Sequence, residues 1–218
     1  MSSDPFVVRP DDHVYGDPAA GVTVLEYGDF ECPYCAAAAP VLKALVDGSG
    51  GGVRLVFRHW PLHEVHPYAL TAALAAEAAA EQGRFWEMHD LLFGHQDRLA
   101  DADLVGYAEQ LGLDPARVVG EAAQPYGDKV EADFATGVAL EVPGTPTVFV
   151  ERQLFSGRPD LAALRRAIGA AATPSGADAG LEPGARGQRR GFLGRRRAQR
   201  ETLAEGAQQQ GAEDRCGQ

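Results

Sequence analysis

Short apolar runs in the first third of the chain predict two buried strands with a helix between them. Residues 22–27 and 53–59 are rich in β-branched and apolar side chains, and the first run ends in Gly-Asp, which is typical of strands. Residues 33–46 have a helical composition, with a proline in the first turn and a glycine-rich stretch behind them. This order of elements predicts a parallel strand pair joined by a crossover helix.

Between about residues 67 and 142 the pattern is helical. Apolar residues recur at helical spacing over residues 85–95 and 101–111, and glycines follow the expected helix ends. Asp101 and Asp114 are candidate N-caps, because an aspartate side chain accepts hydrogen bonds from the first turn of a helix. The segment therefore predicts an all-helical insertion.

Three elements are expected after the insertion. They are a strand over residues 146–150, its antiparallel partner over 153–156 and a closing helix over 159–172. The sequence thus predicts an α/β domain of residues 12–172, in which the helical insertion separates the second predicted strand from the third.

The segment of residues 173–218 has a different composition. It is rich in glycine, alanine, arginine and glutamine, and Phe192 is its only aromatic residue. Such a segment cannot bury enough apolar surface to offset the entropy of ordering, so it is predicted to be a disordered, low-complexity tail. The arginine cluster of residues 186–200 is interpreted as part of this solvated tail, and contact with RNA or an acidic partner is the alternative.

Composition and charge narrow the functional classes. The 218 residues are 45% hydrophobic, and 20 basic side chains stand against 31 acidic ones, a net charge of -11. This balance argues against a nucleic-acid binder, which needs a basic face. The most apolar stretch, residues 69–80, is interrupted by Glu77 and is too short to span a membrane. The first ten residues hold no apolar secretory signal, so a cytoplasmic location is expected.

The strongest chemical motif is Cys32-Pro33-Tyr34-Cys35, placed where a predicted strand ends and a helix begins. The thiolate is the reactive form of cysteine, and a helix N-terminus lowers the pKa of a thiol. A spacing of three residues on a helix brings the two sulfurs close enough to form a disulfide. We therefore expect Cys32 to attack and Cys35 to resolve.

A zinc site is the alternative use of this cysteine pair. Such sites usually need a second pair of ligands at a suitable distance. Cys216 stands alone in the tail, and His59, His63 and His66 are the nearby candidates, in a context more typical of structural or solvated histidines. No metal or other cofactor is expected beyond a redox-active disulfide between the two cysteines.

A second motif, Gly144-Thr145-Pro146-Thr147, precedes the third predicted strand. A proline that enters a strand cannot donate to the hydrogen-bond ladder and sometimes follows a cis peptide bond. The residues by themselves predict only a turn that initiates the strand.

Four segments resemble DsbA-like thiol-disulfide oxidoreductases of the thioredoxin superfamily. They are residues 26–35, 58–67, 82–93 and 144–147. In order and spacing they also resemble the DsbA-like domain fused to some bacterial sodium/proton antiporters. The resemblance covers about residues 12–170 and implies a thioredoxin fold with a helical insertion, in agreement with the pattern of strands and helices.

The resemblance also implies residue roles. Cys32 would be the nucleophile and Cys35 the resolving thiol of a redox-active Cys32–Cys35 disulfide. Glu26 matches the buried acid of the family, which would exchange a proton with Cys35. The alternative for Glu26 is an ordinary strand carboxylate that faces water.

The substrate side is inferred from the same resemblance. Pro33, Tyr34, Thr145 and Pro146 would contact substrate, with Pro146 as a cis-proline and Thr145 offering its backbone to an extended segment. Strongly oxidising DsbA proteins carry histidine at the position of Tyr34, and tyrosine adds no positive charge. A less oxidising pair, in the reducing or middle part of the superfamily range, is therefore expected.

Two functions follow as hypotheses. The first is an enzyme that exchanges disulfides with protein or small-molecule substrates and is recycled by a redox partner. A cytosolic setting favours the reductase or isomerase direction. The second is a non-catalytic module whose redox state changes its binding to a partner.

Overall fold

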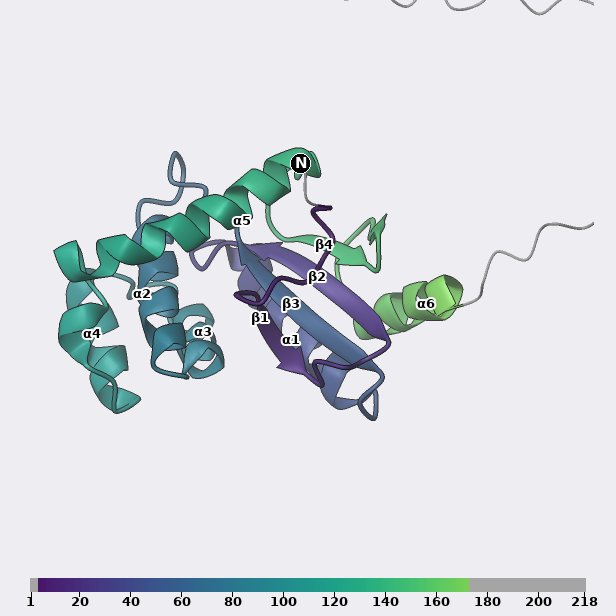
Figure 1. The fold of residues 1–218 in the computed structure, drawn as a ribbon, viewed down its shortest axis with the longest axis horizontal. Coiled ribbons are helices and arrows are strands. Elements are labelled where there is room, and N and C mark those ends of the chain that lie inside the picture. The colour runs from purple at the N-terminus through teal and green to yellow at the C-terminus, as the bar shows by residue number, and fades with distance from the viewer. Residues whose placement is uncertain (1–3, 173–218) are drawn as a thin grey trace, which may run out of the picture. The chain divides into compact units, whose positions relative to one another are not determined.

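A five-stranded mixed sheet organises the computed structural model, which describes residues 4–172. Its strand order is β1-β3-β2-β4-β5 (Figure 1). Strands β2 (Val22–Gly28) and β3 (Val53–His59) lie parallel at its centre, and β4 (Thr147–Val150) pairs antiparallel with β2. The predicted α/β fold of the thioredoxin type is confirmed.

The two edge strands are short. Strand β1 (His13–Gly16) pairs antiparallel with β3 and is absent from the sequence-based prediction. Three partly buried residues and one exposed glycine carry little hydrophobic pattern, so this strand forms through its pairing with β3 rather than through its own propensity. Strand β5 (Gln153–Leu154) pairs with β4 and is shorter than the predicted run of residues 153–156.

Helix α1 (Pro33–Asp47) follows β2 and returns the chain to the start of β3, as predicted. Pro33 is its first residue, a position where the missing N–H of proline has no partner to lose. Helix α1 and the closing helix α6 (Leu161–Ala172) pack on the same sheet face. Their buried apolar cluster comprises Val24, Ala38, Leu42, Leu45, Val46, Val53, Leu55, Val148, Val150 and Leu164.

The opposite sheet face packs against the N-terminal segment and helix α5 (Gly127–Ala139). Tyr27 and Trp60 are buried there, and the Tyr27 hydroxyl lies 2.8 Å from the Thr136 hydroxyl on α5. Gly137 brings the α5 backbone against Trp60, because a Cβ at this glycine would lie 2.4 Å from the indole ring.

The predicted helical insertion contains α2 (Ala69–Glu81), α3 (Phe85–Gly94) and α4 (Asp101–Gln110), followed by the 3-10 helices η1 (Pro115–Arg117) and η2 (Gly120–Tyr126) and by α5. Figure 1 shows α2, α3 and α4 grouped beside one end of the sheet. Helix α2 is buried along most of its length, since its small alanine side chains allow its neighbours to approach closely.

The two predicted helix caps differ from the structure in detail. Ala100 is the N-cap of α4, and Asp101 is the first helical residue instead. Asp114 does act as an N-cap and accepts a hydrogen bond from the Ala116 N–H at 3.1 Å, but it caps the short 3-10 helix η1 (Pro115–Arg117). An aspartate therefore signals a nearby helix start without fixing its position or type.

The predicted tail of residues 173–218, including the arginine cluster and Cys216, lies outside the described residues. The predicted domain limit at residue 172 stays a prediction. Within residues 4–172, no helix is both long enough and apolar enough to cross a membrane.

Replacing Gly137 by alanine is expected to destabilise the domain by about 1–3 kcal/mol, because the new methyl group would overlap Trp60 and approach Tyr27. Gly106→Ala is the matched control, since Gly106 also lies inside a helix but a Cβ there has no atom within 4 Å. Alanine at this control site should raise stability by up to about 1 kcal/mol through helix propensity. Urea unfolding measures the free energy of unfolding of both variants. An equal change in the Gly137→Ala and Gly106→Ala proteins would contradict the close packing of α5 against Trp60.

Candidate active site

The two predicted cysteines lie at the start of α1, with Cys32 as the N-cap and Cys35 inside the first turn. Both are free thiols, and their exposed fractions are 3% and 0%. The Cys32 carbonyl accepts hydrogen bonds from the Cys35 and Ala36 N–H groups, each at 3.1 Å. The Tyr34 and Cys35 N–H groups also stabilise the charge on the Cys32 sulfur, and the positive end of the helix dipole acts in the same direction.

The surroundings hold the two thiols in opposite protonation states. Hydrogen bonding from the Cys35 thiol, helped by Thr145 and by backbone N–H groups, outweighs burial and lowers the pKa of Cys32 to about 5. Burial first, and the partner sulfur second, raise the pKa of Cys35 far above its ordinary value. At neutral pH the reduced site therefore holds a Cys32 thiolate beside a Cys35 thiol, as nucleophilic attack requires.

The loop before β4 faces this pair. The peptide bond between Thr145 and Pro146 is cis, as the resemblance implies. The Thr145 carbonyl oxygen lies 3.4 Å from the Cys32 sulfur and accepts a hydrogen bond from Cys32 when this thiol is protonated. The Thr145 hydroxyl is buried and has no hydrogen-bond partner among the described residues, and the Thr145 side chain contributes to the lowered pKa of Cys32.

Glu26 lies on β2 beneath the cysteines. Its exposed fraction is 0%, and neither carboxyl oxygen has a hydrogen-bond partner among the described residues. Burial, and to a smaller extent the charge of Cys32, raise the pKa of Glu26 to about 8. The water-facing alternative is therefore wrong, while the proton-transfer role of Glu26 stays a prediction.

Asp29 fixes the loop that leads into the cysteines, and sequence reasoning missed it. Its carboxylate accepts hydrogen bonds from the Glu31 N–H at 2.8 Å and the Leu62 N–H at 2.9 Å, and it contacts the His66 ring at 2.8 Å. Its backbone carbonyl accepts from the Cys32 N–H at 3.1 Å. An aspartate directly after a strand is the signal that could have identified it.

Gln96 is the second residue that sequence reasoning missed. It lies between α3 and α4, and its amide nitrogen donates to the carbonyl oxygens of Phe30 and Cys32 at 2.8 and 2.9 Å. A side chain of the helical insertion thus holds the backbone at the start of α1 through two hydrogen bonds. No sequence signal marks Gln96, because its partners lie more than sixty positions away.

Two of the candidate zinc ligands, His59 and His66, have carboxylate partners. His59 and His13 each place Nε2 near one Glu77 oxygen, at 2.6 and 2.5 Å, and these three ligand atoms could in principle surround a metal ion. Two ligands of a tetrahedral zinc ion are about 3.3 Å apart, so the separations fit a shared hydrogen-bonded carboxylate better. His66 contacts Asp29 instead.

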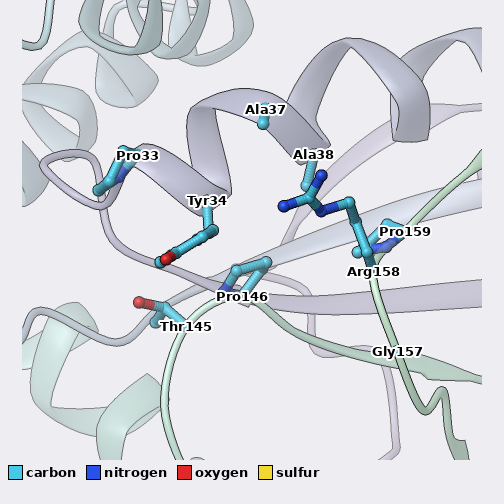
Figure 2. A pocket seen from close by; sticks show the side chains of 9 residues that line it. All are labelled: Pro33, Tyr34, Ala37, Ala38, Thr145, Pro146, Gly157, Arg158 and Pro159. Atoms are coloured by element: carbon cyan, nitrogen blue, oxygen red, sulfur yellow. The ribbon is translucent and has the colours of Figure 1, made fainter.

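A groove of about 550 Å³ runs beside the cysteines (Figure 2). All four predicted substrate-contacting residues line it: Pro33, Tyr34, Thr145 and Pro146. The other lining residues are Ala37, Ala38, Gly157, Arg158 and Pro159. Tyr34 is 64% exposed, and Figure 2 shows its ring directed toward the Thr145–Pro146 loop.

Comparison with known proteins places this geometry in a family. The family model described as Thioredoxin matches residues 9–170. Among solved structures, a thioredoxin-like oxidoreductase from Silicibacter pomeroyi is 32% identical, with a TM-score of 0.66 over 78% of this chain and 98% of that chain. DsbA2 of Pseudomonas aeruginosa is 28% identical, with a TM-score of 0.65 over 78% and 99%.

The curated relatives carry a different name. Na(+)/H(+) antiporter NhaA 1 of Salinispora arenicola is 50% identical over 163 residues, and NhaA 3 of Salinispora tropica is 51% identical over 164 residues. Each alignment covers 74% of this chain but 25% of the relative. The chain therefore spans about a quarter of the length of these relatives.

Glu26→Gln is expected to change the pH dependence of stability, compared in a background in which both cysteines are serine. The folded protein holds the Glu26 proton up to about pH 8, whereas an unfolded carboxyl loses it near 4.5. The parent is thus most stable below about pH 4.5 and loses stability as the pH rises to 8, and the glutamine variant does not. The relative gain of the variant is about 4 kcal/mol over that range, less the small part of the pKa shift that comes from the Cys32 charge, which the serine background removes.

Urea unfolding of both proteins at several pH values measures this difference. Parallel stability profiles between pH 4.5 and 8 would contradict a raised pKa of Glu26.

Proposed function

The chain belongs to the thioredoxin-like family of DsbA-like thiol-disulfide oxidoreductases, and on that basis we propose that it exchanges disulfides with thiol-containing protein or small-molecule substrates through Cys32 and Cys35. One observation carries the proposal: two adjacent thiols with opposed pKa shifts at the start of α1. A purely structural cysteine pair needs no such difference.

The proposed reaction begins with the Cys32 thiolate. In the reductive direction it attacks one sulfur of a substrate disulfide, the substrate S–S bond breaks, and the other sulfur leaves as a thiolate. The product is a mixed disulfide between Cys32 and the substrate. Cys35 then loses its proton and attacks the Cys32 sulfur. This step releases the second substrate thiolate and closes the Cys32–Cys35 disulfide.

We assign the proton of Cys35 to Glu26. Cys35 is a poor nucleophile as a thiol, and its surroundings offer few bases because the site is buried. Glu26, with a pKa near 8, can accept and return a proton at physiological pH. Its negative charge also raises the pKa of Cys35, so the two groups disfavour simultaneous ionisation.

The net direction depends on a recycling partner. Each turnover oxidises the dithiol by two electrons, so a redox partner of the thiol or disulfide class must restore the starting state. That partner, the substrate and the cytoplasmic compartment stay predictions of the sequence analysis.

A second candidate function is redox sensing without turnover. The relatives named as antiporters are about four times as long as the shared region, which favours a domain that works beside another domain or partner. In that case the Cys32–Cys35 state would change binding rather than process substrates. Turnover of a model disulfide separates the two functions.

Cys32→Ser is expected to abolish reduction of a model disulfide such as insulin, because the attacking thiolate is lost. Cys35→Ser should retain the first step and accumulate a mixed disulfide with substrate, which mass spectrometry of acid-quenched samples detects. A Cys32→Ser protein with undiminished turnover would falsify the proposed order of attack.

The redox potential tests how strongly the thiolate is stabilised. In thioredoxin the attacking cysteine has a pKa of about 7 and the disulfide has a reduction potential of roughly -270 mV. In DsbA the corresponding pKa is about 3.5 and the reduction potential is roughly -120 mV. The Cys32 pKa of about 5 lies between them, so we expect roughly -190 mV by interpolation. Equilibration in graded glutathione buffers, with alkylation and mass spectrometry, measures it. A value near that of thioredoxin would contradict the stabilised thiolate.

A further inference from the structure

The groove beside the cysteines has an uneven chemical lining. Most of its wall is apolar or neutral, formed by prolines, alanines, Tyr34 and the Thr145–Pro146 loop. Arg158 is its single charged lining residue. A groove of this kind accommodates an uncharged segment along its floor and favours a negative group at one position.

Among the described residues, Arg158 has no hydrogen-bond or ion-pair partner that would compete with a ligand. Its side chain is exposed, and it makes no hydrogen bond or ion pair with any residue from 4 to 172. Figure 2 shows it reaching from the β5–α6 connection toward Ala38 on α1, across the groove. Asp160, two residues after Arg158, accepts a hydrogen bond from the Ala163 N–H at 2.8 Å in the first turn of α6 instead.

The backbone around Arg158 has restricted freedom. Gly157 adopts φ 104, a conformation that favours glycine, and Pro159 has its φ fixed by its ring. The backbone that carries Arg158 therefore has a restricted conformation. Other arginines of this acidic protein, such as Arg84 with Glu87 and Arg152 with Asp4, are paired with carboxylates.

We propose that the groove takes the segment beside the reacting cysteine of a polypeptide substrate, and that Arg158 selects segments with an acidic side chain there. The inference rests on the proposed disulfide exchange and adds a substrate class to it. We infer an acidic segment because the guanidinium group of Arg158 would pair well with a carboxylate of the substrate. The polypeptide backbone would run along the Thr145 side, where Cys32 is reached.

The test uses the full chain, reduced beforehand, and blocked pentapeptides whose single cysteine is joined to 2-thiopyridine. The residue next to that cysteine is aspartate, asparagine or lysine. The Cys32 thiolate attacks the peptide sulfur, the probe S–S bond breaks, and 2-thiopyridine leaves with the electron pair. Cys35 then releases the peptide thiol and closes the protein disulfide, so the protein is oxidised and the probe reduced.

The measured quantity is the ratio of single-turnover rates for the aspartate and asparagine probes. We expect a ratio of about two to five in the unaltered protein, as for an exposed ion pair, falling as salt is added. Arg158→Gln should bring the ratio close to that of the free dithiol reagent dithiothreitol, and Arg158→Glu should favour the lysine probe. Each probe also differs in the intrinsic reactivity of its disulfide. This difference is the same for every protein variant, so it cancels when the ratio is compared between variants.

Arg166→Gln is the matched control, because Arg166 is also exposed but does not line the groove. This variant should keep the ratio of the unaltered protein. An identical ratio in the unaltered protein and Arg158→Gln would overturn the role of Arg158. An Arg158-dependent rate with oxidised glutathione but not with the peptides would overturn the polypeptide assignment. Failure to release 2-thiopyridine from any probe would instead refute the underlying disulfide exchange.

Discussion

The site depends on holding one negative charge on Cys32 while its neighbour stays protonated. The start of α1 supplies backbone N–H groups and the Cys35 thiol, and the loop before β4 adds the Thr145 side chain. Burial acts on both sulfurs, but the donors are directed at one of them. The same burial leaves Glu26 without partners and raises its pKa. Burial thus raises the pKa of Cys35 and Glu26, while the hydrogen bonds directed at Cys32 outweigh its effect there and lower the pKa of this thiol.

Local sequence patterns predicted much of this arrangement. The helix start at Pro33 and the position of Cys32 at the helix N-terminus follow from short-range rules, and the structure has both. The central strands were predictable because their apolar runs are continuous, as expected for strands covered on both faces. The roles of Thr145 and Pro146 came from resemblance, since local rules indicate only a turn at that position.

The remaining features needed long-range information. The burial of Glu26 depends on which elements cover β2, and periodicity alone left it undecided. Strand β1 exists through its pairing with β3. Gln96 reaches its partners from a different part of the chain. The exact helix starts in the insertion also shifted by a residue or changed type, because caps report a boundary only approximately.

The two hydrogen bonds of Gln96 make the start of α1 depend on the helical insertion. The strand and helix core looks like a self-sufficient unit to which a helical segment has been added. However, the carbonyl groups that flank the entrance to α1 are held by a side chain of that added segment. Excision of the insertion would therefore leave a recognisable sheet with an unsupported reactive turn. Evolutionary change in the insertion is constrained by the chemistry of the core, even where it touches no substrate.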